Sequence, residues 1–143
     1  MKKGWKLGLA LMATVIWLWF IFSRSAANGD ASHNESTAVL ELLGKRPTLF
    51  NMLIVRKGAH FLEFFILGSL VYLDWRFLNR GTVLLPLSAG LLFAALDELL
   101  QTFIPGRSGQ LLDVLIDFCG VAAGVGAGLL LRRWREARRR AKG

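Results

Sequence analysis

Residues 111–131 read LLDVLIDFCGVAAGVGAGLLL, an almost unbroken apolar stretch near the C-terminus. A helix crosses the hydrocarbon core of a bilayer with ~20 mostly apolar residues, so this stretch is long enough to span a membrane. After Asp117 in the sequence, the glycines Gly120, Gly124 and Gly128 recur at four-residue spacing and share one face of the helix. Small residues on one face let helices approach closely in lipid. The segment therefore predicts a transmembrane helix that packs through its glycine face.

The whole chain has the composition of a membrane protein. Of its 143 residues 54% are hydrophobic, the mean hydropathy is +0.45 and the formal net charge is +8. A soluble chain of this length buries too little surface to hide so much apolar area. These values exclude a soluble enzyme, a disulfide-rich secreted domain and a disordered chain. The single cysteine, Cys119, permits no internal disulfide, and no nucleic-acid motif accompanies the basic charge, so no nucleic-acid partner is expected.

Three further stretches are long enough to cross a bilayer, namely residues 7–22, 58–75 and 82–103. Short connections between the later stretches make consecutive helices antiparallel neighbours. The first stretch is also compatible with a signal peptide, because lysines precede it and small residues follow it. We favour an uncleaved helix, since Trp17 and Trp19 resemble interfacial anchors. The expected fold is all-α, a polytopic membrane protein with four transmembrane helices.

Lysine and arginine residues are distributed unequally around these four stretches. One side of the predicted membrane carries twelve of them and the other side carries six. The richer side faces the cytoplasm by the positive-inside rule, so both termini are predicted to be cytoplasmic in a multi-pass protein of the bacterial cytoplasmic membrane. The seven basic residues within residues 132–143 are expected to contact anionic lipids. The other five residues on this side are Lys2, Lys3, Lys6, Arg76 and Arg80.

The long connection at residues 23–55 is expected to lie on the outer side of the membrane. Its first part, residues 23–36, is polar and small and predicts a flexible segment. Ser36 or Thr37 would cap a short helix that ends at Gly44 and lies on the outer membrane face. The chain then divides into an N-terminal helix with its loop (1–54), a three-helix core (55–131) and a basic cytoplasmic tail (132–143).

Ionisable and polar residues inside the spans carry most of the functional information. Each ionisable group costs ~2.5–3.5 kcal/mol on insertion scales, and such groups persist when they are paired, hydrated or functional. The predicted topology places all of them at a similar depth, close to the outer surface. They are His60, Glu63, Asp97, Glu98, Gln101, Asp113 and Asp117.

The five carboxylates in this group outnumber the nearby cations Lys57 and Arg107, even with His60 charged. Crowded carboxylates cannot all stay ionised in a low-dielectric site without compensation. Either some are protonated, or a divalent cation binds, or a cationic substrate group does. For Arg107, pairing with a buried aspartate and binding of a phosphate or other anion are both open.

The same residues can form a functional site or a structural network that pins three helices. As a site, the expected catalytic or acid/base residues are His60, Glu63, Asp97, Glu98 and Asp113. The expected substrate-binding residues are Lys57, Gln101, Arg107 and Asp117. A divalent cation is a candidate cofactor, and His60, Glu63 and the aspartates would hold it as an alternative to acid/base work, since His60 and Glu63 can present two ligands on one helical face.

These residues resemble the motifs of the VanZ-like family of bacterial membrane proteins, named for a teicoplanin-resistance protein. The first matching piece is Arg56-Lys57-Gly58-Ala59-His60-Phe61-Leu62-Glu63-Phe64. The others are Asp97-Glu98 with Gln101 and Pro105-Gly106-Arg107, then Asp113, Asp117, Gly120 and Gly124. Order and spacing agree over about residues 55–131. The family more often has Asn at the position of Asp117, so this chain carries an additional charge there.

The resemblance implies a small polytopic membrane protein linked to tolerance of glycopeptides, chiefly teicoplanin. We expect it to act at the outer leaflet on envelope lipids, lipid-linked cell-wall intermediates or lipophilic glycopeptides, with Lys57 and Arg107 holding an anionic head group. One alternative is a metal-assisted hydrolase or transferase of lipid phosphates. Another is a non-enzymatic membrane scaffold. A transporter is less favoured, because the polar residues stop near one surface and form no path across.

Overall fold

The computed structural model describes residues 4–27, 29–78 and 81–142. The predicted charges Lys2, Lys3 and Arg80 lie outside the described residues. Within these ranges the chain is helical and contains no strand. The five helices are α1 (Gly4–Ser25), α2 (Gly29–Leu42), α3 (Leu49–Leu78), α4 (Leu84–Gln101) and α5 (Leu111–Arg140).

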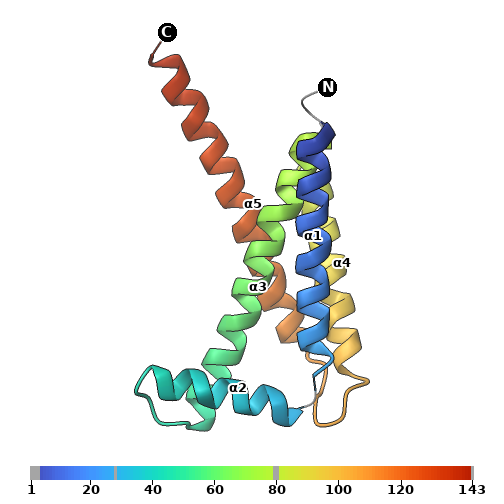
Figure 1. Cartoon of the computed structure of the whole chain (residues 1–143), viewed down its shortest axis with the longest axis vertical. Coiled ribbons are helices and arrows are strands. Elements are labelled where there is room, and N and C mark those ends of the chain that lie inside the picture. Colours follow the sequence, from blue (N-terminus) through green and yellow to red (C-terminus); the bar gives the residue numbers. More distant parts are fainter. Residues whose placement is uncertain (1–3, 28, 79–80, 143) are drawn as a thin grey trace.

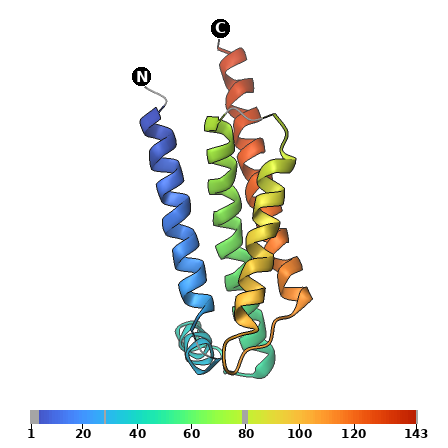
Figure 2. The same ribbon diagram turned by 90° about the vertical axis from the view of Figure 1, so that its right-hand side faces the viewer.

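Four of the helices run along one another, and the fifth lies across one end of them. Helices α1, α3, α4 and α5 form an elongated bundle, and α2 crosses the end where α1 finishes and α3 begins (Figures 1 and 2). The start of α1 and the end of α5 both lie at the opposite end of the molecule, apart from each other (Figure 1). The last turns of α5 lean away from the other helices. This arrangement gathers the inter-helix connections at the α2 end around a single region.

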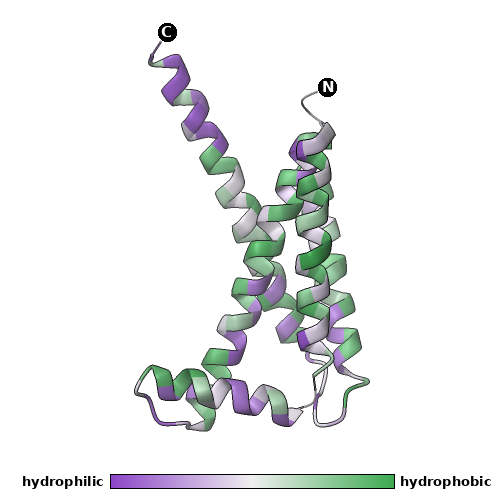
Figure 3. Ribbon diagram, in the orientation of Figure 1, coloured by the Kyte–Doolittle hydropathy of each residue, from purple (hydrophilic) through white to green (hydrophobic). Residues whose placement is uncertain are grey.

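Three of the described helices are long and apolar enough to cross a membrane, namely α1, α4 and α5. Helix α3 is longer than α4, but His60, Glu63 and Asp74 interrupt its apolar stretch. On length and composition, the expectation of four spans is therefore met for three helices. Polar residues gather on α2 and on the projecting end of α5, whereas the middle of the bundle is mostly apolar (Figure 3).

Helices α3 and α5 make the closest crossing in the bundle, and glycines permit it. A Cβ atom on Gly124 would lie 2.8 Å from the backbone nitrogen of Ser69 and closer still to the carbonyl oxygen of Phe65. A Cβ atom on Gly120 would collide with the carbonyl oxygen of Phe61 in the same way. Backbone meets backbone at these points, so the predicted glycine face is indeed the packing face of α5.

Helix α1 is joined to the bundle by polar contacts along its length. The Thr14 hydroxyl donates a 2.6 Å hydrogen bond to the buried carboxyl of Asp74 on α3. The Trp17 indole N–H donates a 2.9 Å hydrogen bond to the backbone carbonyl of Glu63. In an apolar surrounding such bonds are favoured because unpaired donors are costly there. They hold α1 in register with α3, which matters because the last residues of α1 enter the site described below.

The first loop differs from the sequence expectation. Helix α2 begins at Gly29, not at Ser36, so much of the segment expected to be flexible is helical. The small polar residues there are poor helix formers in isolation. Packing against α3 overrides that preference, because α2 buries Ser36 and Leu40. A short helix thus exists in the first loop, but it is longer than expected and begins earlier in the sequence, soon after the end of α1.

Helices α3 and α5 also exceed the predicted spans. Helix α3 begins at Leu49 and not at residue 58, and α5 continues through the basic tail to Arg140. The tail has mostly good helix-forming residues. The Arg132 and Glu136 side chains form a 2.7 Å ion pair at i, i+4 spacing there, which adds a small stabilisation.

Candidate functional site

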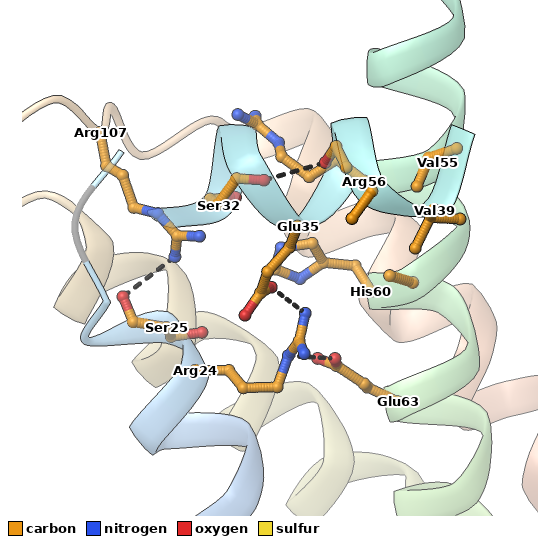
Figure 4. Close-up of a pocket in the computed structure, with 13 residues that line it drawn as sticks. Arg24, Ser25, Ser32, Glu35, Val39, Val55, Arg56, His60, Glu63 and Arg107 are labelled. Carbon is orange, nitrogen blue, oxygen red and sulfur yellow. Dashed lines mark hydrogen bonds and ion pairs between the residues drawn. The ribbon is translucent and has the colours of Figure 1, made fainter. Parts of the chain in front are cut away.

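The α2 end of the bundle holds a polar pocket of about 320 Å³. Helices α1, α2 and α3 line it together with the loop between α4 and α5 (Figure 4). Guanidinium groups come from three different elements, since Arg24 ends α1, Arg56 lies on α3 and Arg107 lies in the loop. Val39 and Val55 supply an apolar wall. The pocket therefore offers positive charge beside a hydrophobic surface.

Arg24 links three helices by pairing with two carboxylates. Its Nη2 lies 2.8 Å from Glu35 Oε2 on α2, and its Nε lies 2.9 Å from Glu63 Oε1 on α3 (Figure 4). The Glu63 side chain is mostly buried, whereas Glu35 is half-exposed. These pairs secure α2 over the end of α1, and they leave Glu63 with a compensated charge.

The Asp113 carboxylate, in the first turn of α5, is held by two cations of α3. Lys57 contacts Asp113 Oδ1, and Arg56 Nη2 lies 3.4 Å from Oδ2. Glu98 of α4 accepts a 2.5 Å hydrogen bond from the backbone N–H of Gln110, the residue that precedes α5. Asp113 thus joins the start of α5 to α3, and Glu98 joins it to α4, which fixes the direction of α5.

Deeper in the bundle, His60, Asp97 and Asp117 converge from α3, α4 and α5. One ligand-type atom of each residue lies within 4.8 Å of the corresponding atoms of the other two. His60 Nδ1 is 3.4 Å from Asp117 Oδ1. Asp97 Oδ2 accepts hydrogen bonds from the Ser25 hydroxyl at 2.8 Å and from the Gln101 amide at 3.0 Å. The aspartates are fully buried, and His60 also reaches the pocket wall.

Arg107 is the cation of the pocket that has no carboxylate partner within 4.0 Å among the described residues. Its Nη1 donates a 3.0 Å hydrogen bond to the neutral backbone carbonyl of Ser25 (Figure 4). Burial lowers the pKa of the Arg107 guanidinium, and the nearby positive charge of Arg56 lowers it further. The pairing of Arg107 with Asp113 or Asp97, one of two expectations, is not formed.

The loop that carries Arg107 is shaped by glycine. Gly106 has a φ of +77°, a conformation that L side chains rarely adopt. The backbone N–H of Gly29 lies 3.4 Å from the Pro105 carbonyl oxygen, and a Cβ atom on Gly29 would lie 2.6 Å from the Gly106 oxygen. The loop therefore rests against the first residue of α2, which aims Arg107 at the pocket.

All nine residues expected from the sequence lie at this end of the bundle, but they separate into groups. Glu63 joins the arginine pairs, Lys57 and Asp113 pair with each other, and Glu98 holds a backbone N–H. His60, Asp97, Gln101 and Asp117 form the deeper cluster, and Arg107 faces the pocket.

Sequence reasoning missed four residues of the site: Arg24, Ser25, Glu35 and Arg56. Arg24 was visible only as one of the six charges on the outer side of the predicted membrane, and Arg56 only as such a charge and as the first residue of the family motif, with nothing to give either residue a partner. Glu35 falls in the segment expected to be flexible. Ser25 lies seventy-two positions before Asp97, its hydrogen-bond partner, and no local spacing connects them. These contacts can be recognised only from the packing of α1 and α2 against α3 and α4.

Fold and site together define a small helical protein with three helices long and apolar enough to cross a membrane and an arginine-lined pocket at one end of the bundle. The chain belongs to the VanZ/LLP1 family, whose match covers residues 10–132. This confirms the resemblance seen in the motifs and extends it over α1 and α2. No curated protein and no solved structure matches the chain.

Proposed function

We propose that this protein binds the anionic head group of an envelope lipid or a lipid-linked cell-wall intermediate at the outer face of the bacterial cytoplasmic membrane. Arg107 is the observation that carries the proposal. A half-buried guanidinium has lost part of its hydration, and a neutral carbonyl compensates it only in part. A phosphate group can accept two parallel hydrogen bonds from a guanidinium. Arg56 and Arg24 place further positive charge near the Arg107 guanidinium, and Glu35 and Asp97 offset part of it.

An amphiphilic ligand fits the surroundings better than a small soluble anion. Val39 and Val55 line the pocket beside the arginines. Outside it, α2 and the first turns of α3 expose Leu42, Phe50 and Ile54. Large exposed apolar residues that gather around a polar opening mark a surface covered by lipid or another partner. The head group would enter the pocket while the acyl or prenyl chain stays on this apolar rim.

The placement in the membrane is part of the proposal. We infer that α3 crosses together with α1, α4 and α5, because its ionisable groups pair with the neighbouring helices and not with lipid. The excess of lysine and arginine at the end with both termini then puts that end in the cytoplasm and the pocket at the outer surface.

This placement also accounts for the expected link to teicoplanin. That glycopeptide carries an acyl chain and concentrates at the outer leaflet, where an amphiphile-binding pocket would meet either the drug or the lipid-linked intermediate that it targets. Tolerance would then follow from binding at the pocket, without a change in the peptidoglycan precursor.

The decisive experiment measures lipid binding to purified protein in nanodiscs. Probes are a polyprenyl phosphate and phosphatidylglycerol, with phosphatidylcholine as the neutral reference. Arg107→Gln should weaken binding of the anionic lipids about tenfold or more, because a hydrogen bond to a charged group contributes ~1.5–3 kcal/mol. Arg46→Gln is the matched control, since Arg46 is an exposed arginine of the connection between α2 and α3 that does not line the pocket. Equal binding by wild type and Arg107→Gln would refute the proposal.

A second measurement tests the role in the cell. Wild type, Glu63→Gln and Asp113→Asn are expressed in a susceptible Gram-positive host at matched membrane levels, and the inhibitory concentrations of teicoplanin and vancomycin are compared. We expect tolerance selective for teicoplanin, and we expect both variants to lose it. A purely structural role, the scaffold alternative, predicts instead that the variants lower the amount of folded protein while activity per folded molecule stays the same.

A second candidate function is metal-assisted hydrolysis or transfer of a lipid phosphate. The observation that favours it is the convergence of His60, Asp97 and Asp117 next to the pocket. A divalent ion there could polarise a phosphoryl oxygen of the bound head group. Release of inorganic phosphate from the same polyprenyl phosphate probe distinguishes this function from binding alone.

A further inference from the structure

The His60, Asp97 and Asp117 cluster contains buried polar atoms that nothing in the described part of the chain satisfies. Neither oxygen of the Asp117 carboxyl has a hydrogen-bond partner there, although the side chain is 0% exposed. Asp97 Oδ1 has no hydrogen-bond partner either, and His60 Nδ1 forms no hydrogen bond but lies 3.4 Å from Asp117 Oδ1. A buried polar group without a partner costs ~1–3 kcal/mol, and more when it is charged. Several such atoms that face one another indicate an occupant.

Hydrogen bonds from outside the cluster orient one of its carboxyl groups, as they do for ligands in metal sites. Ser25 and Gln101 both donate hydrogen bonds to Asp97 Oδ2, so they orient the carboxyl and leave Oδ1 free to face His60 and Asp117. Such outer contacts fix the orientation of first-shell ligands in metal sites. Here the two hydrogen bonds come from Ser25 on α1 and Gln101 on α4, so two helices fix the orientation of the Asp97 carboxyl.

Charge balance points in the same direction. With every carboxyl ionised, the six carboxylates of the pocket and the cluster outnumber Lys57 and three arginines by two negative charges. Protonation of His60 would supply one positive charge, and its 3.4 Å contact would satisfy at most one oxygen of Asp117. The other Asp117 oxygen and Asp97 Oδ1 would remain unpaired. A divalent cation removes the excess and gives all three residues a partner.

We infer that His60, Asp97 and Asp117 bind a divalent transition-metal cation, Zn²⁺ or Mn²⁺. One imidazole nitrogen with two carboxylate oxygens suits these ions, whereas Mg²⁺ prefers oxygen ligands and keeps several waters. Ligand atoms around Zn²⁺ lie roughly 3.4 Å apart at ordinary bond lengths. The three atoms here lie within 4.8 Å of one another, so small side-chain rotations would bring them into place.

Three protein ligands leave the metal with an open coordination position. His60 lines the pocket as well as the cluster, so the open position would face the pocket. An oxygen of a bound phosphate head group, held on its other side by Arg107, could occupy it. This part of the inference rests on the proposed function and names phosphate as the head-group class, whereas binding of the metal alone does not depend on lipid.

The test measures metal binding without any lipid ligand. Protein purified in a neutral detergent is stripped with a chelator, and titrations with Zn²⁺, Mn²⁺ and Mg²⁺ are followed by calorimetry, with bound metal counted by mass spectrometry. We expect one equivalent of Zn²⁺ or Mn²⁺ per chain and weaker binding of Mg²⁺. Asp117→Asn should weaken binding at least about tenfold, and Ser25→Ala should weaken it by about ten- to a hundredfold through Asp97.

Asp74→Asn is the matched control, because Asp74 is a buried carboxyl of the same bundle that bonds to Thr14 outside the cluster. It should leave metal affinity unchanged, because the asparagine amide oxygen still accepts the Thr14 hydrogen bond that holds α1 in register. If Asp117→Asn does not fold, wild-type protein still gives an answer, since a specific metal raises its melting temperature and the chelator reverses the rise. No bound metal in wild type, or equal affinity in wild type and a folded Asp117→Asn, would overturn the site. Lipid binding that persists without metal would leave the proposed function standing, so the two failures are distinguishable.

Discussion

Alanine at Gly124 is expected to separate α3 from α5, whereas alanine at Gly126, two residues further along, is expected to have no such effect. The added Cβ at Gly124 would lie 2.8 Å from the backbone nitrogen of Ser69, against an optimum of roughly 3.5 Å. The nearest atoms belong to the α3 backbone and cannot rotate away. A Cβ at Gly126 meets nothing within 4 Å.

The size of the effect follows from this geometry. To relieve the Ser69 contact alone, α3 and α5 would have to move apart by roughly 0.7 Å. A gap of that size removes about a quarter to a half of the attractive energy of each van der Waals contact between the two helices. Overpacking of this kind costs ~1–3 kcal/mol. For a chain of this size the melting temperature falls by roughly 4 °C per kcal/mol, so Gly124→Ala should lower it by about 4–12 °C.

The assay is thermal unfolding in one detergent, with Gly126→Ala as the control. Gly126→Ala should melt at or slightly above the wild-type temperature, because alanine favours helix over glycine by ~1 kcal/mol. Gly124→Ala should also weaken metal binding, since His60 on α3 and Asp117 on α5 face each other across the same crossing. Equal melting temperatures for the two variants would refute the close-packed crossing.

Two further predictions concern the elements that close the pocket. Leu40 of α2 is 1% exposed and Leu42 is 88% exposed. Leu40→Ser should therefore detach α2 and abolish binding of the anionic lipid probes, whereas Leu42→Ser should preserve that binding. Limited proteolysis of the first loop should be faster than in wild type only for Leu40→Ser. Gly106→Ala forces an L side chain into a φ of +77°, at a cost of ~1–2 kcal/mol. It should shift Arg107 and weaken lipid binding in the nanodisc assay, with little change in metal affinity; unchanged lipid binding would show that the loop does not aim Arg107.

Much of the fold was predictable because its signals are local. Apolar length predicts α1, α4 and α5, and four-residue spacing of small residues predicts the packing face of α5. The short helix in the first loop was predicted, but its start was wrong. Its early residues have low helix propensity, and they become helical because burial of Leu40 against α3 stabilises the whole segment. Helix propensities of the individual residues do not include the stabilisation that tertiary packing adds.

The candidate site was predictable as a set of residue types and not as a set of contacts. Glu63 and Asp113 looked like equivalent members of one acidic cluster. In the structure each has its own cation, Arg24 for the first and Lys57 for the second. Pairing of charges depends on which side chains meet across helices, and residues on different helices have no fixed spacing in the sequence.

What the sequence by itself determined is the environment of this protein and the chemistry available to it. Its apolar content predicts membrane-spanning helices, and the acidic, histidine and arginine residues of its motifs are predicted to lie at one end of them. Only the tertiary structure decided which of these residues pair with one another and which stay without a partner. Packing of α1, α3, α4 and α5 satisfies most of the charges with neighbours and leaves Arg107 without a carboxylate and Asp117 without a hydrogen bond among the described residues. Those unsatisfied groups are where a ligand gains most, because burial has already removed their water.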